Sequence, residues 1–204
     1  MKTYFVILAA GTGEMFASDA PKQFLKISWK TAFEHSISAF EHNDDFIDEI
    51  IIVAHKDFLE TCKNIIEKSG FKKVTNIVAG GSTRKESSSI RLNQIQEKEA
   101  KVLIHDSVGP LILDEIISKC ISELDIHDAI DVAVQTIDTI IKTNIYGTVC
   151  EIPVRQNFMS GQTTHCFKLS LIKRAHQLVK LIDIPFKDDC GIVNLFKLAK
   201  IHVI

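Results

Sequence analysis

Short apolar runs alternate along the chain with stretches whose apolar residues recur at a helical spacing. The runs Tyr4–Ala9 and Glu49–Ala54 are typical of strands buried on both faces of a sheet. Between them, Thr31–Glu41 has the apolar spacing of a helix, and Gly70 is a stop signal for the helix expected before it. The same criteria predict strands at Val74–Val78, Lys101–His105 and Ile130–Gln135, and helices at Asp57–Ser69, Thr83–Glu97 and Asp114–Leu124, with Asp114 as N-cap.

This alternation predicts βαβ units with right-handed crossovers, and hence an α/β fold with a mostly parallel sheet covered by helices. In such sheets, ligands bind at the carboxyl ends of the strands. Beyond Gln135 the pattern changes to two short extended segments, Asp138–Lys142 and Val149–Arg155, joined around Gly147. They predict a protruding β-hairpin arm at about 137–160. Because no repeat or Pro/Gly/Ser-rich linker interrupts the chain, a single domain over residues 1–204 is expected.

Composition excludes several classes of protein. The chain has 24 Lys and Arg against 26 Asp and Glu, a net charge of −2, which does not fit a basic nucleic-acid-binding surface. No apolar run approaches the ~20 residues of a membrane-spanning helix, so no membrane partner is expected. Five cysteines without a C-x-x-C pair argue against a disulfide framework or structural zinc and favour a reducing cytoplasm.

A glycine-rich loop, Leu8–Gly13, follows the first predicted strand directly. Its small residues let the backbone approach a ligand closely, and successive N–H groups can bind an anion. Neither the dinucleotide fingerprint nor the Walker phosphate loop is present, so a simple tight turn is the alternative. Lys22 follows Pro21 shortly afterwards and suits phosphate neutralisation, although a lone surface lysine is usually just solvated.

The segments Ala9–Gly13 and Pro21–Leu25 together resemble the opening of the cytidylyltransferases that join CTP to a sugar-alcohol phosphate. That family includes methylerythritol-phosphate and ribitol-5-phosphate cytidylyltransferases. The resemblance covers nearly the whole chain and implies a doubly wound, Rossmann-like fold of the nucleotide-diphospho-sugar transferase type. It implies a catalytic role for Lys22 and nucleotide contacts from Ala9, Ala10, Gly11 and Gly13.

Two further blocks match the family's nucleotide site. Gly80–Ser87 opens a predicted helix, where glycines and hydroxyls can bind a polar ring edge or an anion, although a capping box from Thr83 to Glu86 is the alternative. The resemblance implies that Gly80, Gly81 and Ser87 hold the cytosine while Arg84 organises the loop.

Asp106 ends the fourth predicted strand, where a carboxylate is the hard oxygen ligand that Mg²⁺ prefers. The alternative is an aspartate that closes a turn before Pro110. With the other blocks in register, Asp106 is expected to contact Mg²⁺ and the nucleotide ribose. His105 is expected to pack or hydrogen-bond beneath the site rather than to carry out acid–base chemistry.

The acceptor site of the family maps onto the arm and the segment after it. The resemblance implies that Thr139, Arg155 and Thr163 bind the acceptor phosphate, and that the arm reaches a neighbouring subunit in a homodimer. A surface ion pair within the arm is the alternative for Arg155. Asp188–Cys190 resembles the acidic pair that opens the next helix, although helix capping alone would explain it.

The expected reaction is an in-line attack by the acceptor phosphate on the α-phosphorus of CTP, with release of pyrophosphate and a CDP-alcohol. Three segments favour D-ribitol 5-phosphate as acceptor, with 2-C-methyl-D-erythritol 4-phosphate next: Ser107–Val108, where the methylerythritol branch usually has alanines, Asp138–Ile141 and Ile152–Arg155. Met15 and Gly109 replace two family arginines, and the sequence ends at Ile204, before the family's lysine-bearing closing segment. The alternative hypothesis is therefore an impaired or inactive relative that binds nucleotide or only dimerises.

Overall fold

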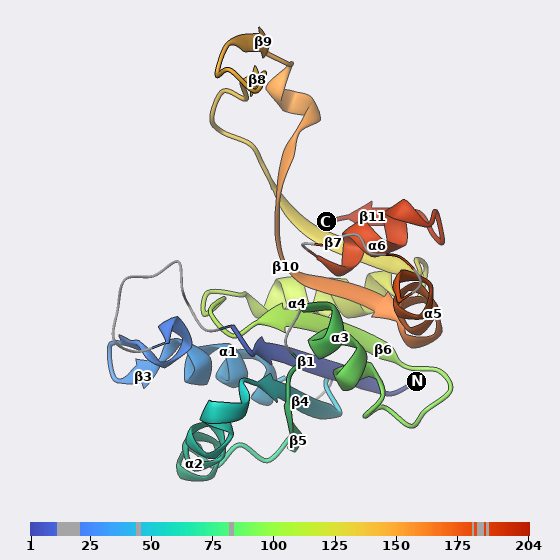
Figure 1. The fold of residues 1–204 in the computed structure, drawn as a ribbon. Helices are drawn as coiled ribbons and strands as arrows, with labels where there is room; N and C mark the ends of the chain where they lie inside the picture. Colours follow the sequence, from blue (N-terminus) through green and yellow to red (C-terminus); the bar gives the residue numbers. More distant parts are fainter. Residues whose placement is uncertain (12–20, 44–45, 82–83, 181, 183–185, 187) are drawn as a thin grey trace.

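The computed structural model describes residues 1–11, 21–43, 46–81, 84–180, 182, 186 and 188–204. Its centre is a seven-stranded sheet in the order β11-β7-β10-β6-β1-β4-β5 (Figure 1). Every neighbouring pair is parallel except the two pairs made by β10. The strands of this sheet are β1 Thr3–Ala9, β4 Glu49–Ala54, β5 Val74–Ala79, β6 Lys101–Asp106, β7 Ala129–Gln135, β10 Met159–Lys168 and β11 Ile201–Val203.

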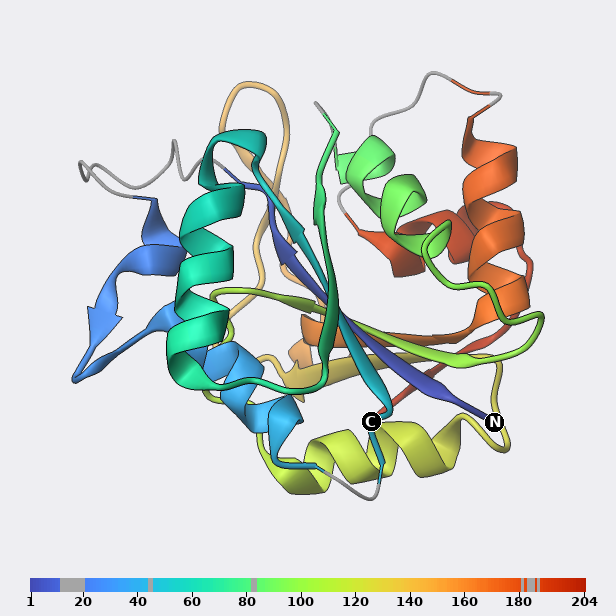
Figure 2. The ribbon, with the colours of Figure 1, turned by 90° about the horizontal axis from the view of Figure 1, so that it is seen from below.

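Helices cover both faces of the sheet (Figure 2). The alternating side chains of β1 explain this, since Phe5 and Ile7 pack with α1, α2 and α4, while Tyr4 and Val6 pack with α3, α5 and α6. None of the helices in the described part of the chain is long and apolar enough to cross a membrane. The helices are α1 Ala32–Glu41, α2 Leu59–Ser69, α3 Arg84–Leu92, α4 Asp114–Glu123, α5 Leu169–Val179 and α6 Asp189–Leu195.

The predicted α/β fold is confirmed, and several helix ends differ from the prediction. The helix predicted at Asp57–Ser69 begins at Leu59, because Lys56–Phe58 form a 3₁₀ turn. The helix predicted to reach Glu97 ends at Leu92, because the chain turns there and buries Ile95 in the core. Asp114 is the first residue of α4 rather than its N-cap, which is Leu113. The Asp114 carboxylate instead accepts a hydrogen bond from Asn43 Nδ2 at 3.0 Å.

The sequence pattern predicted neither the strand β10 nor the helix α5 that follows it, nor the short strands β2 (Lys26–Ile27) and β3 (Lys30–Thr31). β10 lies antiparallel between β6 and β7, with a register shift between Gly161 and His165. The sheet is therefore mostly parallel, as predicted, but one of its inner strands runs the opposite way. A run of threonines, histidine and cysteine gives no apolar periodicity, which is why this strand did not stand out.

The arm, residues 136–158, connects β7 to β10 and projects from the body of the molecule (Figure 1). Its hairpin is shorter than predicted, because only β8 (Lys142–Thr143) and β9 (Val149–Glu151) pair. Gly147 turns the chain between them with a φ of +78°, a left-handed conformation that suits glycine. The remaining short elements are the β2–β3 hairpin (Lys26–Ile27 and Lys30–Thr31) and the 3₁₀ turns η1 (Lys22–Phe24), η2 (Lys56–Phe58) and η3 (Arg155–Asn157).

A buried charge network ties α3 to α5 and α6. Arg91 Nη2 donates to Asp189 Oδ2 at 2.7 Å, and His176 Nε2 lies 2.8 Å from Asp189 Oδ1. All three residues are buried. Burial by itself would raise the pKa of Asp189, but the Arg91 charge and the contact with His176 hold it well below its usual range.

We predict that Asp189→Asn lowers the free energy of unfolding by about 3–5 kcal/mol, because it removes the buried negative charge that Arg91 Nη2 and His176 Nε2 contact. The depressed pKa means that this contribution is full above about pH 4, the unfolded range of aspartate, and is lost as the pH falls further. Urea denaturation between pH 3 and 7 measures both effects.

The matched control is Asp188→Ala, which removes only the N-cap bond from Gly191 N–H and should cost about 0.5–2 kcal/mol. Equal losses in the two variants, or an unchanged acid slope in Asp189→Asn, would contradict the assigned role of this network.

Candidate active site at the carboxyl ends of the parallel strands

The parallel strands β1, β4, β5 and β6 end at one rim of the sheet. Their register places Leu8 opposite Asp106, Ala9 opposite Ala54, and Ala54 opposite Ala79. The loops that leave these strands are therefore neighbours. This edge carries the predicted glycine loop, the Gly80–Gly81 turn and Asp106, as expected for a ligand site in a parallel sheet.

A buried glutamine holds the start of the glycine loop. Gln23, only 1% exposed, donates from Nε2 to the carbonyl oxygens of Ala9 at 3.2 Å and Gly11 at 3.1 Å. Lys22 directly precedes Gln23 in η1, so the Gln23 hydrogen bonds hold the Lys22 backbone beside the loop. The Lys22 side chain is partly exposed. The predicted site residue Gly13 and the departure at Met15 lie outside the described residues.

Gly80 brings the second loop against the first. A Cβ atom at Gly80 would lie 2.8 Å from Ala10 Cβ and 2.9 Å from Ser87 Oγ, closer than packed atoms allow. The Gly81 N–H donates to Ser87 Oγ at 3.1 Å, which fixes the turn to α3. Four predicted nucleotide-binding residues thus lie together: Ala10, Gly80, Gly81 and Ser87.

Arg84 begins α3 immediately after this turn. The structure describes its backbone, which opens the helix three residues before Ser87, and not its side chain. The alternative capping box falls partly outside the described residues, because Thr83 is not among them.

Asp106 is the last residue of β6 and is half-buried at the rim. The chain turns directly after it, since Ser107 N–H donates to Leu8 O at 3.0 Å and Gly109 N–H donates to Asp106 O at 3.1 Å. The predicted turn is therefore present, and its contact to Asp106 is made by the backbone carbonyl. The aspartate stands beside the end of β1, next to the glycine loop.

His105 lies beneath this turn. Its ring centroid is 5.9 Å from that of Phe5 and 5.4 Å from that of Phe40, and the side chain is 1% exposed. Nδ1 lies 3.1 Å from Thr164 Oγ1 and Nε2 lies 2.8 Å from Gly109 O. Burial lowers the pKa of His105, so the ring packs and hydrogen-bonds under the rim as a neutral group.

The space next to Gly109 is filled by this histidine. A Cβ atom at Gly109 would lie 2.5 Å from His105 Nε2. Restoring the family arginine at this position therefore requires a shift of the His105 ring.

The three predicted acceptor residues fall into two groups. Thr163 lies in β10, next to the buried Thr164 that contacts His105, and so belongs to the body of the molecule. Thr139 and Arg155 lie in the arm, away from the glycine loop (Figure 1). Arg155 Nη1 donates to Ile137 O at 2.6 Å, so its observed contact is a backbone hydrogen bond rather than the alternative ion pair.

The acidic residues at the start of α6 have separate partners. Asp188 caps the helix through Gly191 N–H, as the capping alternative proposed, whereas Asp189 joins the buried network with Arg91. Cys190 faces a cluster that sequence reasoning missed, formed with Asp131 of β7 and His165 of β10. A charged residue inside a predicted buried strand was the available signal for Asp131.

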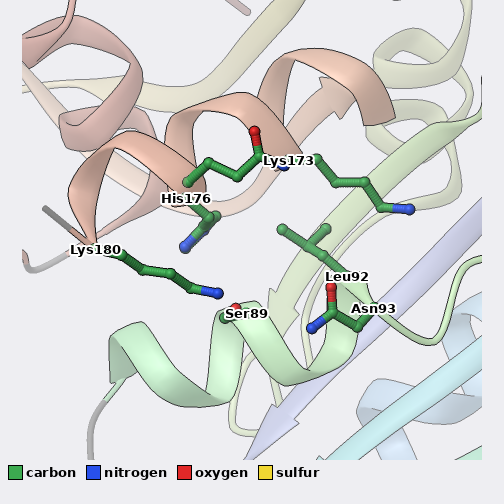
Figure 3. Close-up of a pocket in the computed structure, with 7 residues that line it drawn as sticks. Ser89, Leu92, Asn93, Lys173, His176 and Lys180 are labelled. Atoms are coloured by element: carbon green, nitrogen blue, oxygen red, sulfur yellow. The ribbon is translucent and has the colours of Figure 1, made fainter.

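A pocket lies between α3 and α5 (Figure 3). It includes two lysines, of which Lys173 donates to Ile95 O at 2.8 Å. None of the predicted site residues within the described ranges lines it, so it is distinct from the rim of the sheet. Its lining residues are Ser89, Leu92, Asn93, Lys173, His176, Gln177 and Lys180.

A family model described as IspD, 2-C-methyl-D-erythritol 4-phosphate cytidylyltransferase, matches residues 3–203. The chain belongs to the IspD family. The family resemblance drawn from the motifs is therefore confirmed, and the family is one of nucleotidyltransferase enzymes.

Two relatives and one solved structure illustrate the match. The chain is 40% identical over 195 residues to the bifunctional ribulose 5-phosphate reductase/CDP-ribitol pyrophosphorylase Bcs1 of Haemophilus influenzae, covering 94% of the chain but only 41% of that protein. It is 34% identical over 194 residues to the 2-C-methyl-D-erythritol 4-phosphate cytidylyltransferase of Alkaliphilus metalliredigens, covering 95% of the chain and 80% of the relative. The crystal structure of 4-diphosphocytidyl-2C-methyl-D-erythritol synthase from Anaerococcus prevotii superposes with a TM-score of 0.87 at 25% identity, covering 100% of the chain and 88% of that structure.

We predict that Gly109→Ala lowers the free energy of unfolding by about 1–3 kcal/mol, because its Cβ overlaps the His105 ring. Thermal and urea denaturation measure the loss. Gly161→Ala is the matched control, since a Cβ there meets nothing within 4 Å. In a His105→Ser background the added cost of Gly109→Ala should disappear, and a cost that persists would show that the clash is not its cause.

Proposed function

We propose that this IspD-family chain transfers CMP from CTP to a sugar-alcohol phosphate and releases pyrophosphate. The observation that carries the proposal is the convergence of two glycine turns and Asp106 at one rim of the sheet. Backbone N–H groups at a loop and at the start of a helix favour phosphates and polar ring edges. This arrangement suits a nucleoside triphosphate better than the pocket between α3 and α5.

Mg²⁺ fits the donor chemistry at the rim. Asp106 offers a half-buried carboxylate beside the glycine loop, and carboxylate oxygens together with nucleotide phosphates are the usual ligands of this ion. When bound, Mg²⁺ would neutralise charge on the triphosphate. The chain itself supplies a fixed loop for the phosphates, through Gln23, and a cation beside it, through Lys22.

The chemistry proposed is an in-line displacement. A phosphate oxygen of the acceptor forms a bond to the α-phosphorus of CTP, and the bond from that phosphorus to the bridging oxygen of pyrophosphate breaks. Because negative charge develops on the phosphates, catalysis consists of positioning and electrostatic stabilisation. Lys22 is proposed to stabilise this charge, and Ala9–Gly11, Gly80, Gly81, Arg84 and Ser87 to bind the nucleotide.

D-ribitol 5-phosphate is proposed as the acceptor, ahead of 2-C-methyl-D-erythritol 4-phosphate. The Haemophilus relative, whose name includes CDP-ribitol pyrophosphorylase, is 40% identical, against 34–36% for several 2-C-methyl-D-erythritol 4-phosphate cytidylyltransferases. Ser107, which lies in one of the three segments that favoured this branch, is 4% exposed, and its backbone carbonyl accepts a hydrogen bond from Ser36 Oγ at 3.1 Å. The backbone of this serine therefore ties the turn after Asp106 to α1, through Ser36.

We predict pyrophosphate release with CTP, Mg²⁺ and D-ribitol 5-phosphate, faster than with 2-C-methyl-D-erythritol 4-phosphate. Lys22→Ala should lower kcat by about 10²–10³, the usual effect of removing one preorganised charge-stabilising group. Lys30→Ala is the matched control, because Lys30 Nζ is bonded to Ser38 Oγ on α1 at 2.9 Å. Turnover with neither acceptor would contradict the proposal, and equal losses in the two variants would contradict the role of Lys22.

The arm is proposed to bind a second copy of the chain. Large apolar side chains on it are exposed, including Ile137 at 82%, Ile145 at 90% and Tyr146 at 84%, and such a cluster on one projection indicates an interaction surface. In a symmetric dimer, Thr139 and Arg155 would meet the partner's site, while Thr163 and Asp106 stay with their own body. The composite site would then need both chains.

We predict that light scattering finds a dimer and that Ile145→Lys/Tyr146→Lys converts it to monomers. Ile126→Lys, at a 75% exposed apolar residue outside the arm, is the matched control and should remain dimeric. Mixing Lys22→Ala with Arg155→Ala chains should restore part of the activity, because each mixed dimer contains one intact composite site. A monomeric wild type, or no restoration in stable mixed dimers, would contradict the arm's proposed role.

A second candidate function, nucleotide binding without turnover, is favoured by Gly109 and the His105 ring that fills the space beside it. Under this alternative, CTP binds and no pyrophosphate is released with any acceptor. Restoring arginines at Met15 and Gly109, with His105 shortened to serine, should then create activity if the rest of the scaffold is intact.

A further inference from the structure

The strongest unexplained cluster lies where α6 packs on the sheet, at Asp131 of β7, His165 of β10 and Cys190 of α6. One ligand atom from each residue lies within 4.8 Å of the other two. His165 and Cys190 are 6% and 5% exposed, while Asp131 is half-buried, so the cluster is enclosed on one side and approachable on the other.

Two polar atoms of this cluster have no hydrogen-bond partner among the described residues. They are Asp131 Oδ1 and His165 Nδ1, and both are buried. The contact between Asp131 Oδ1 and His165 Nε2 is 3.5 Å, which is long for a hydrogen bond. Buried polar atoms are normally paired, so a buried Asp131 Oδ1 that has only this long contact to His165 Nε2 requires an explanation.

We propose that Asp131, His165 and Cys190 bind a divalent transition-metal ion such as Zn²⁺. Carboxylate, imidazole and thiolate are the donors that Zn²⁺ takes in proteins, and three protein ligands leave the fourth tetrahedral position for water. In such a site the ligand atoms are about 3.3–3.7 Å apart, so the cluster needs to contract by about 1.5 Å at most from its present spacing.

The mixed donor set distinguishes this cluster from the proposed Mg²⁺ site. Mg²⁺ prefers oxygen ligands alone, whereas sulfur and imidazole select softer ions. Asp188, which caps α6, places a second carboxylate near the cluster and adds to the attraction for a cation. The absence of C-x-x-C pairs excluded a local zinc motif and did not exclude ligands drawn from three separate elements.

A metal here would connect α6 to two strands of the sheet. His165 is two residues from Thr163, and its neighbour Thr164 contacts His105 beneath the rim. The bound ion would therefore fix the irregular stretch of β10 where its pairing with β7 changes register. The inference does not depend on the proposed reaction, because it concerns metal affinity and stability rather than turnover.

The test is a titration of the chelator-treated full chain with Co²⁺, followed by absorption spectroscopy. We expect one Co²⁺ per chain with a thiolate-to-metal charge-transfer band, which carboxylates such as Asp106 cannot produce. Cys190→Ser should lose the band, and Asp131→Asn and His165→Gln should bind Co²⁺ more than about 100-fold more weakly, exceeding the usual effect of losing a supporting partner. Cys150→Ser is the matched control, since this thiol is exposed on the arm.

Zn²⁺ provides a second readout that does not depend on cysteine spectroscopy. It should raise the Tm of the wild type and leave that of Asp131→Asn unchanged, even if Cys190→Ser fails to fold. Binding below one equivalent, a spectrum without the sulfur band, or its loss in Cys150→Ser would overturn the proposal. Binding that persists in Asp131→Asn and disappears in His127→Gln would also overturn it, because it would place the ion on the surface cluster Glu123–His127–His202.

Discussion

The close approach of the Gly80 backbone to Ala10 and Ser87 is the constraint on which the candidate site depends. No side chain fits between these segments, so the glycine loop after β1 and the turn into α3 contact each other directly. Gln23 Nε2 holds the glycine loop through the carbonyls of Ala9 and Gly11. The hydrogen bond from Gly81 N–H to Ser87 Oγ holds the turn into α3. Two loops 70 residues apart in sequence thereby form one surface beside Asp106.

Buried contacts on both faces of the sheet hold the elements that carry this surface. On one face, the buried network of Arg91, His176 and Asp189 connects the helix that carries Ser87 to α5 and α6. On the other, His105 packs against Phe5 and Phe40 and holds the turn after Asp106. These contacts hold the elements that carry the rim of the sheet. The arm projects from this body and exposes large apolar side chains. Such a cluster is typical of a surface that binds another protein.

Local sequence patterns predicted most strands of the central sheet and the helices α1 to α4. Continuous apolar runs predicted β1, β4, β5, β6 and β7 almost to the residue, although not the short parallel strand β11. Motif spacing indicated the family. These patterns missed β10, because a strand of threonine, histidine and cysteine has no apolar period, although its neighbours bury it. They also missed the partners of Asp189 and of Cys190, since these contacts join residues from 13 to 98 positions apart. Neither composition nor periodicity carries information about such pairs.

Calorimetric titration with CTP in the presence of Mg²⁺, comparing the wild type with Gly80→Ala, measures whether these two loops bind the nucleotide. A Cβ at Gly80 has to displace Ala10 or Ser87, and restoring their positions on binding would cost about 1–3 kcal/mol. We therefore expect one CTP per wild-type chain and ~5–150-fold weaker binding in the variant. Gly161→Ala, where the added atom meets open space, should bind as the wild type does. No CTP binding by the wild type, or equal affinity in Gly80→Ala, would contradict the claim that these two loops form the nucleotide site.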